Sequence, residues 1–389
     1  ADGAGRAGGS AAPARRCVSG TREDAPRVVH LDTERGWRGG ERQVLWLAEQ
    51  LARTGHCSMV AARSGEPLVA RAAAAGLAVV RCDPRMEFDP RAALRLRAMV
   101  RHERMDIVHA HTAHAVALGA MATAGTAAEL VVTRRVDFAL RNNGFTRWKY
   151  GRASTIIAIS GAVRDALIAS GVGAARIAMV TDGIPLDRRI APASVETLAA
   201  LGVPAGIPLV VMVAALVQHK DPLTFVSAVN ALRHRVPAAR ALLVGDGPLR
   251  RAVQDEISRL GLGDVLMLTG YRTDADALIA AAGVVVLSSE QEGMGSVLLD
   301  AMALGKPVAA TTAGGIPDIV IDAETGLLVP PHDGAALGEA IARLLTDAAL
   351  AERLGRAGAA RVQRFSMERT AAATAAVYSR VLADRGRSR

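Results

Sequence analysis

Short apolar runs alternate with amphipathic stretches along most of the chain. In the stretch 39–56, for example, Val44, Leu47 and Leu51 recur at the spacing of one helix face, and Gly55 follows as a stop signal. The apolar runs themselves have the length of buried strands. They lie at 27–31, 58–62, 106–111, 129–135, 155–160, 177–183, 209–216, 239–247, 264–270, 284–289 and 307–312. This strand–helix–strand rhythm predicts parallel sheets with helices on both faces.

One interruption divides the rhythm into two halves. The stretch 187–208 contains proline and glycine without a strong period, and strands and helices alternate again after it. A chain of 389 residues is also too long for one small core. We therefore expect an α/β protein of two doubly wound, Rossmann-like domains. The expected parts are a disordered tail (1–24), an N-terminal domain (25–190), a linker (191–207), a C-terminal domain (208–366) and a C-terminal helix that packs back on the N-terminal domain (367–389).

The most informative strand end is the one that follows the apolar run 284–287. Glu292 and Asp300 stand eight positions apart there, across a glycine-rich bend, and Ser296 is expected to cap the helix that carries Asp300. Carboxylates suit sugar hydroxyls, whereas bare backbone amides at a helix start suit phosphates. The amides in question belong to Gly293, Met294, Gly295, Ser296 and Val297. A nucleotide sugar has both kinds of group, and the alternative is two unrelated surface acids.

Two further strand ends carry groups that suit a phosphate. Gly39 and Gly40 open a helix after the first strand, where bare backbone and the helix N-terminus favour an anion; a tight turn is the alternative. Lys220 follows a strand of the second half, where its charge would neutralise a diphosphate, although a surface lysine is the simpler interpretation. Because open parallel sheets bind ligands at the carboxyl ends of their strands, we expect the ligand between the two halves.

Histidines and a few loop residues complete the candidates. In DIVHAHTAH (106–114) we expect His109 to be buried and His111, last in the strand and on the opposite face, to reach the ligand, with His114 as a second candidate. No acid or cysteine lies at the spacing of a zinc site, so no metal is predicted. Loop residues that follow strands of the second half are further candidates for donor contacts. They are Gly245, Tyr271 and Arg272.

The charge of the chain is concentrated in its first half. The formal net charge is +9, and residues 1–190 hold 28 basic against 18 acidic residues, whereas residues 191–389 hold 19 against 20. A basic half predicts an anionic partner such as a phospholipid surface or a lipid-linked acceptor, although a solvated basic surface is an equal alternative. Aromatic residues make up 3%, which disfavours single-stranded nucleic acid. No apolar stretch reaches the length of a membrane span, so we expect a cytoplasmic protein, peripheral at most at the inner face of the membrane.

Together these motifs resemble the retaining glycosyltransferases of family 4, or glycosyl transferases group 1, over residues 27–383. The matching segments are the glycine pair at 39–40, DIVHAH (106–111), IAISGAVRDALIASGV (157–172), VTDGI (180–184), the segment around Lys220, EGMGSVLLDAMALGKPV (292–308) and FSMERT…VYSRVL (365–382). The resemblance implies the GT-B fold. It further implies that Glu292 contacts the transferred sugar, Asp300 the ribose, Lys220 and the Gly-Gly amides the diphosphate, and His111 the donor sugar.

Three positions depart from the family pattern. The second acid is Asp300 rather than glutamate, the family arginine five positions before the lysine is Ala215, and an Asn-Gly turn is Asp182-Gly183. Arg134 and Arg135, at a strand end of the first half, are candidate substitutes for the missing phosphate clamp.

The resemblance implies transfer of a sugar from a nucleoside diphosphate sugar to an acceptor hydroxyl with retention, without a metal or cofactor. Because residues 1–190 are basic, we expect the reaction to belong to the synthesis of a cell-envelope glycolipid, lipopolysaccharide or polysaccharide. The alternatives are a nucleotide-sugar epimerase of the same architecture and a catalytically weak nucleotide-sugar-binding protein. A dehydrogenase is disfavoured because the Gly-x-Gly-x-x-Gly fingerprint is absent from the Gly39 loop.

Overall fold

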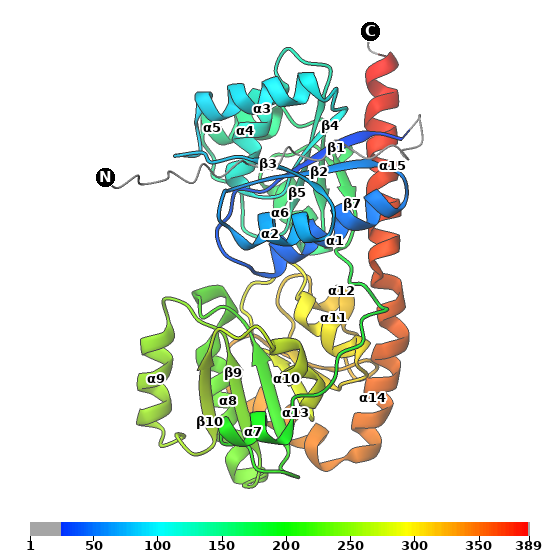
Figure 1. Ribbon diagram of the computed structural model, residues 1–389. Helices are drawn as coiled ribbons and strands as arrows, with labels where there is room; N and C mark the ends of the chain where they lie inside the picture. The colour runs from blue at the N-terminus through cyan, green and yellow to red at the C-terminus, as the bar shows by residue number, and fades with distance from the viewer. Residues whose placement is uncertain (1–24, 388–389) are drawn as a thin grey trace, which may run out of the picture. The chain divides into compact units, whose positions relative to one another are not determined.

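The computed structural model describes residues 25–387, and the predicted tail at 1–24 lies outside this range. The chain forms two parallel sheets, each covered by helices (Figure 1). This confirms the predicted α/β class with two doubly wound domains. The strands are buried apolar runs, as in Val284–Leu287, because helices cover both faces of a parallel sheet.

The first sheet has seven strands in the order β3-β2-β1-β4-β5-β6-β7. Its strands are β1 (Arg27–Leu31), β2 (Cys57–Ala62), β3 (Ala78–Arg81), β4 (Ile107–Ala110), β5 (Glu129–Arg134), β6 (Thr155–Ala158) and β7 (Ile177–Met179). The helices between them are α1 (Gly39–Arg53), α2 (Pro67–Ala74), α3 (Pro90–His102), α4 (Ala113–Thr123), α5 (Gly144–Gly151) and α6 (Gly161–Ala169). The strand order reverses between β1 and β4, which makes this pair the topological switch point of the sheet.

The second sheet has six strands in the order β10-β9-β8-β11-β12-β13, so its switch point lies between β8 and β11. Its strands are β8 (Leu209–Val213), β9 (Arg240–Val244), β10 (Leu266–Gly270), β11 (Val284–Leu287), β12 (Val308–Thr311) and β13 (Leu327–Val329). The helices of this half are α8 (Pro222–Arg235), α9 (Arg250–Arg259), α10 (Ala275–Ala281), α11 (Ser296–Ala303), α12 (Ile316–Ile319), α13 (Gly334–Thr346) and α14 (Ala348–Arg361).

The segment between the two sheets is less irregular than the sequence suggests. The predicted linker 191–207 contains helix α7 (Val195–Ala200), whose N-cap Ser194 accepts a hydrogen bond from the backbone N–H of Thr197 at 3.2 Å. None of the residues of α7 is buried, and this explains why the sequence shows no hydrophobic period there.

The predicted C-terminal helix is present as α15 (Met367–Arg387). Its first turn is fixed to the segment after β7, because the N–H of Met367 donates to the carbonyl of Ile184 at 2.9 Å and the hydroxyl of Thr370 donates to the carbonyl of Thr181 at 2.9 Å. A Cβ at Gly183 would lie 2.5 Å from the Thr370 hydroxyl, so this close approach requires the glycine. Among the described helices, none is both long and apolar enough to cross a bilayer.

The packing of α13 against α8 gives a prediction about stability. An alanine Cβ at Gly338 would lie 2.6 Å from the carbonyl oxygen of Ala228 and 2.8 Å from the Cβ of Ala231. We expect overpacking in Gly338→Ala to lower the free energy of unfolding by about 1–3 kcal/mol. The higher helix propensity of alanine offsets part of this loss. Thermal unfolding measures this, with Gly151→Ala as the control, because a Cβ there meets nothing within 4 Å. An unfolding midpoint that does not fall for Gly338→Ala would contradict the packing.

Candidate functional site

The switch point of the second sheet brings together two of the predicted residues. Lys220 lies in a short 3-10 helix, Gln218–Lys220, that follows β8, and Glu292 lies in the loop that follows β11. The ammonium of Lys220 forms a salt bridge with Glu292 Oε2. Ligands of open α/β sheets bind outside the carboxyl ends of the strands at such a point. The sequence identified both residues, and the strand order explains why they meet.

The ion pair has further polar neighbours. Glu292 is buried, and a buried carboxylate needs partners. Besides Lys220, its Oε2 accepts a hydrogen bond from the Ser289 hydroxyl at 3.1 Å. Neighbouring His219 is half-buried, and burial lowers its pKa, with the charge of Lys220 acting in the same direction. Both neighbouring groups therefore act on His219, and Glu292 has a salt bridge and a hydroxyl donor as its partners.

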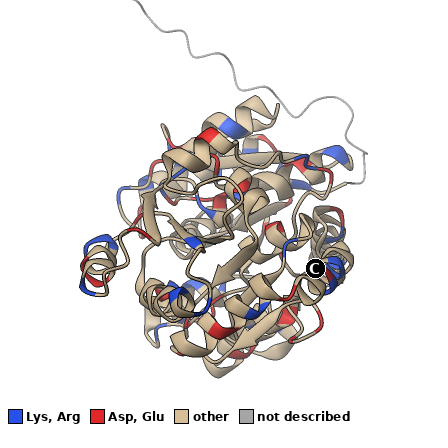
Figure 2. Ribbon diagram, turned by 90° about the horizontal axis from the view of Figure 1, so that it is seen from below, with Lys and Arg blue, Asp and Glu red and all other residues tan. Residues whose placement is uncertain are grey.

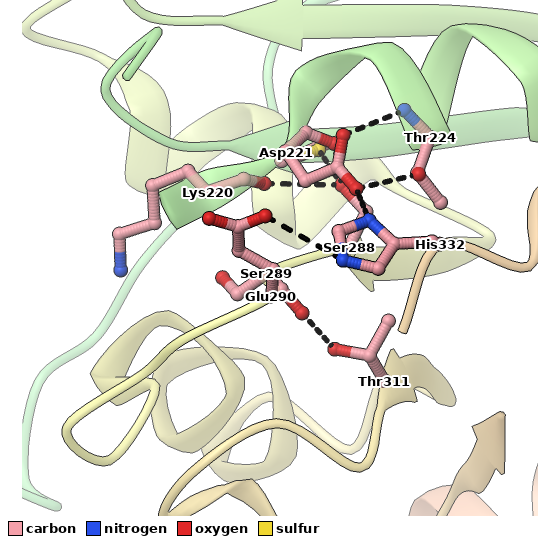
Figure 3. Close-up of polar contacts among 9 residues, drawn as sticks. Lys220, Asp221, Thr224, Ser288, Ser289, Glu290, Thr311 and His332 are labelled. Atoms are coloured by element: carbon pink, nitrogen blue, oxygen red, sulfur yellow. Dashed lines mark hydrogen bonds and ion pairs between the residues drawn. The ribbon is translucent and has the colours of Figure 1, made fainter. Parts of the chain in front are cut away.

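The loop after β11 is held by side-chain hydrogen bonds to its own and the neighbouring backbone (Figure 3). The Ser288 hydroxyl donates to the carbonyl of Asp221 at 2.8 Å, and the Thr311 hydroxyl, at the end of β12, donates to the carbonyl of Ser289 at 2.6 Å. The N–H of Glu290 donates to the carbonyl of His219 at 3.0 Å. These bonds tie β8, β11 and β12 together at one end of the sheet and fix the backbone that carries Glu292.

The residue after Lys220 belongs to a polar cluster that the sequence did not reveal, formed by Asp221, Thr224, Glu290 and His332. Asp221 adopts the left-handed conformation with φ 42° and caps α8, accepting from the N–H of Thr224 at 3.1 Å and from its hydroxyl at 2.6 Å. His332, which follows β13, contacts Asp221 Oδ2 through Nδ1 at 2.8 Å and Glu290 Oε2 through Nε2 at 3.5 Å. In Figure 3 the Lys220 ammonium points away from this cluster. The cluster therefore fixes the backbone and leaves the ammonium to Glu292.

The glycine-rich bend starts α11 in a way that differs from the prediction. Gly295, with φ 83°, occupies the N-cap position, and Ser296 is the first helical residue rather than the cap. A left-handed cap favours glycine, which the sequence pattern did not indicate. The first-turn amides of a helix have no preceding helical carbonyl to donate to. The start of α11 therefore has backbone N–H groups close in sequence to Glu292, and the buried residues Gly293 and Met294 lead into it.

Asp300 is buried in α11 and forms a salt bridge with Arg188. Arg188 comes from the segment between β7 and α7, and its other terminal nitrogen contacts Asp276 at 3.0 Å. The sequence identified the acid but not the arginine, because Arg188 lies 112 positions away in a stretch without a period. An arginine therefore does stand in this region, although not at the position of Ala215.

The remaining candidates of the second half have structural partners. A Cβ at Gly245, where φ is 146°, would lie 1.9 Å from the carbonyl oxygen of Ala214, so a close backbone approach explains this glycine. Arg272 binds Asp274 through two nitrogens, at 2.7 and 2.6 Å, and this lowers the pKa of Asp274. Tyr271 is exposed.

The two arginines considered as phosphate clamps are held by neighbours. Arg134 donates to the carbonyl of Phe138 and to the hydroxyl of Tyr150, the latter at 3.3 Å. Arg135 forms a salt bridge with Asp182 at 3.0 Å, which gives the aspartate of the Asp-Gly turn a structural role. Either arginine would have to exchange these partners to bind a phosphate.

The histidines of the first half form a cluster at the switch point of its sheet. His30 of β1 pairs in register with His109 of β4, and His30 Nδ1 lies 3.0 Å from His111 Nε2. The expectation that His109 and His111 lie on opposite faces is wrong, because residues two apart on a strand share a face. Both are buried, and their ring centroids are 4.0 Å apart. His114 is exposed and lies 3.9 Å from Glu34.

This cluster is also compatible with a metal ion. One ring nitrogen from each of the three histidines lies within 4.8 Å of the others. The sequence did not reveal the set, because His30 stands 79 positions before His109. Gly39 and Gly40, which follow β1, form the first turn of α1, where the N–H of Arg38 donates to Glu41 at 2.7 Å. A Cβ at Gly40 would meet nothing within 4 Å, so packing does not require glycine at this position.

Two family models match the two halves of the chain. The model described as Glycosyltransferase Family 4 matches residues 37–188, and the model described as Glycosyl transferases group 1 matches residues 196–361. The boundary between them falls in the segment that precedes α7.

Curated relatives and solved structures agree with these matches. The chain is 34% identical over 217 residues to the D-inositol 3-phosphate glycosyltransferase of Streptomyces avermitilis, covering 52% of this chain and 47% of the relative. It is 34% identical over 246 residues to the 2-deoxystreptamine glucosyltransferase of Streptomyces kanamyceticus, and the match covers 61% of this chain and 63% of the relative. The chain thus spans about half the length of the first relative. Its fold is similar to that of HepE from Anabaena in complex with UDP and glucose, with a TM-score of 0.80, 23% identity, and 91% and 99% of the two chains covered.

The hydrogen bond between Thr311 and Ser289 gives a prediction about the loop. Thr311→Val keeps the shape of the side chain but leaves the buried carbonyl of Ser289 without this donor, so we expect about 1–3 kcal/mol lower stability. Thr346→Val is the matched control, because its hydroxyl donates only within α13, to the carbonyl of Ala342. Denaturant unfolding measures both variants. Equal stabilities for the two would show that the Thr311 bond does not hold the loop.

Proposed function

Because the chain belongs to the glycosyltransferases described by the family 4 and group 1 models and has the GT-B fold, we propose that it transfers a sugar from a nucleoside diphosphate sugar to an acceptor hydroxyl with retention of configuration. The observation that carries this proposal is the ion pair of Lys220 with Glu292, which lies at a switch point beside the start of α11. A cation, a carboxylate and helix-start amides suit a diphosphate joined to a sugar. The complex of HepE with UDP and glucose supports this class of donor.

In this proposal the donor exchanges partners with the ion pair. The diphosphate replaces Glu292 as the partner of Lys220, and the amides at the start of α11 donate to its oxygens. Glu292, released from the ammonium, accepts hydrogen bonds from hydroxyls of the transferred sugar. Asp300 binds the ribose and keeps Arg188 as its counter-charge. In this exchange Lys220 keeps an anionic partner throughout, whereas Glu292 exchanges its counter-charge for hydrogen bonds from the sugar hydroxyls.

The proposed reaction is a front-face substitution at the anomeric carbon. The acceptor oxygen forms a bond to this carbon while the bond from the carbon to the diphosphate oxygen breaks. The electron pair of the broken bond stays on the diphosphate, and the acceptor proton passes to the same oxygen. Lys220 and the amides stabilise the negative charge that develops there, which is electrostatic catalysis by preorganised donors. No metal takes part in this scheme.

The acceptor in this proposal is a glycan or a lipid-linked molecule of cell-envelope synthesis, used at the cytoplasmic face of a membrane. The excess of basic residues in 1–190 supports an anionic surface as a partner, and nucleic acid is not part of the proposal. The relatives named for D-inositol 3-phosphate and 2-deoxystreptamine show that polyhydroxylated small molecules are also to be tried as acceptors.

Donor binding and slow donor hydrolysis test the proposal without knowledge of the acceptor. UDP-, GDP- and ADP-sugars are screened by ligand-observed NMR, and hydrolysis of each binder is followed. We expect one of them to bind and to be hydrolysed slowly. Lys220→Ala and Glu292→Gln should each reduce hydrolysis by about 10²-fold or more, because the first removes the charge that stabilises the leaving diphosphate and the second weakens the hydrogen bonds that hold the transferred sugar.

Lys306→Gln is the matched control for the lysine variant. Lys220 and Lys306 are the two lysines of residues 191–389, and we expect the Lys306 variant to hydrolyse the donor like the wild type. If no nucleotide sugar binds, or if Lys220→Ala is as active as Lys306→Gln, the assigned site is wrong. Turnover of the sugar without an acceptor and without hydrolysis would instead favour an epimerase.

The absence of a metal from the scheme gives a separate prediction. Dialysis against EDTA should leave donor hydrolysis unchanged, because Lys220 and the backbone amides supply the positive potential that a metal ion would otherwise provide. Loss of hydrolysis, with recovery on addition of Zn²⁺, would contradict this prediction. The candidate metal ligands would then be His30, His109 and His111.

A further inference from the structure

A pocket of about 540 Å³ lies between β3 and the first turns of α3, in the first half of the chain. It belongs to none of the elements at the two switch points. Four arginines line it, and their side chains come from three places: the end of β3, the loop after it and one side of α3. They are Arg81, Arg85, Arg91 and Arg95, and all four are exposed. Two acids, Asp83 and Asp89, also line the pocket, so the formal charge of its lining is +2.

Both acids are directed to hydrogen-bond donors of the protein. Asp83 accepts from the N–H and the hydroxyl of Ser64, each at 2.7 Å, and the hydroxyl bond contributes most to its lowered pKa. Asp89 is the N-cap of α3 and accepts from the backbone N–H groups of Arg91 at 3.1 Å and Ala92 at 3.0 Å. The carboxylates therefore hold local structure, and each also interacts electrostatically with one pocket arginine, Asp83 with Arg81 and Asp89 with Arg85.

The pocket arginines differ from their neighbours on the same helix. Arg97 donates to the carbonyl of Met121 and Arg101 to the carbonyl of Gly125, at 2.6 and 2.8 Å, so these two hold α3 against the end of α4. Within residues 25–387, no side-chain hydrogen bond or ion pair involves Arg91 or Arg95. These two are four positions apart on one helix face, where like charges repel each other. Asp83 and Asp89 leave the pocket lining with a formal charge of +2, which an anion would offset.

Exposed apolar side chains accompany these arginines. Met86 is 65% exposed, Phe88 49% and Leu94 59%, and the first two also line the pocket. Leu94 lies three positions after Arg91, on the same face of α3. The segment 81–96 also contains the acids Asp83, Glu87 and Asp89, and basic and acidic residues are likewise interspersed on the helices visible in Figure 2. A segment that combines arginines with exposed large apolar side chains is typical of a protein that lies on a lipid surface.

We propose that residues 81–96 are the membrane-docking surface of this protein and that the partner is an anionic phospholipid bilayer. The arginines contact lipid phosphates, and Met86, Phe88 and Leu94 enter the boundary between headgroups and acyl chains. This rests on the proposed function, because it locates the membrane contact of an enzyme that uses a lipid-linked acceptor. A soluble polyphosphate would use the arginines but not the apolar side chains, and the apolar residues therefore favour the bilayer.

Vesicle co-sedimentation of the full chain tests this docking surface. We expect binding to phosphatidylcholine vesicles that contain phosphatidylglycerol, weaker binding at high ionic strength, and no binding to phosphatidylcholine alone. The triple variant Arg85→Ser, Arg91→Ser, Arg95→Ser should bind about a hundredfold more weakly. The double variant Met86→Ser, Phe88→Ser should also bind vesicles more weakly. Its affinity should depend on ionic strength as that of the wild type does, because its arginines are unchanged.

Matched variants separate the surface from net charge alone. Arg235→Ser, Arg251→Ser, Arg356→Ser removes the same charge from exposed arginines of α8, α9 and α14, and Met267→Ser removes an exposed methionine of β10. Both controls should bind vesicles like the wild type. Equal losses for the two arginine triples would overturn the proposal, as would absence of vesicle binding. An unchanged affinity of the Met86 and Phe88 variant, with full displacement by inorganic pyrophosphate, would instead assign a site for soluble anions.

The same variants distinguish this proposal from the proposed function. None of their residues belongs to the donor site, so slow hydrolysis of the donor in solution should be unchanged in all of them. If the wild type binds anionic vesicles but no nucleotide sugar, the glycosyltransferase proposal fails and the docking surface stands. If it hydrolyses the donor but does not bind vesicles, the reverse holds.

Discussion

The ion pair between Lys220 and Glu292 is the interaction on which the candidate site depends. A buried carboxylate is unfavourable without a counter-charge, and Lys220 supplies it from the neighbouring strand end. The pair in turn requires a rigid backbone on both sides. Asp221 with Thr224 and His332 fixes the lysine side, whereas Ser288 and Thr311 fix the glutamate side. The polar groups around the pair thus hold two reactive side chains together without taking up the lysine charge.

The two sheets use their switch points differently. At β1 and β4 the first sheet gathers three buried imidazoles and the glycine turn that begins α1. At β8 and β11 the second sheet gathers a cation, two acids and the start of α11. This division fits a donor whose diphosphate and ribose are held by the second half. The docking surface on β3 and α3 would use the charge excess of the first half, on elements that form neither switch point.

Most strands and helices, and the residues of the loop after β11, could be predicted from the sequence. Side-chain contacts between segments that the strand order brings together could not. Lys220 and Glu292 could be predicted because each follows an apolar run at a strand end. His332, Arg188 and His30 could not, because their contacts depend on which strands are neighbours. The error at His109 and His111 came from misapplying the two-residue period of a strand. The error at Ser296 came from a left-handed glycine, because serine is usually the better cap.

A crystal structure of the chain with a bound nucleoside diphosphate tests the central claim most directly. We predict that the diphosphate lies beyond β8 and β11, with its oxygens in hydrogen-bond reach of the Lys220 ammonium and of the amides at the start of α11, and with Glu292 released from Lys220. A nucleotide bound elsewhere, or an ion pair of Lys220 and Glu292 that persists beside the bound diphosphate, would contradict the account.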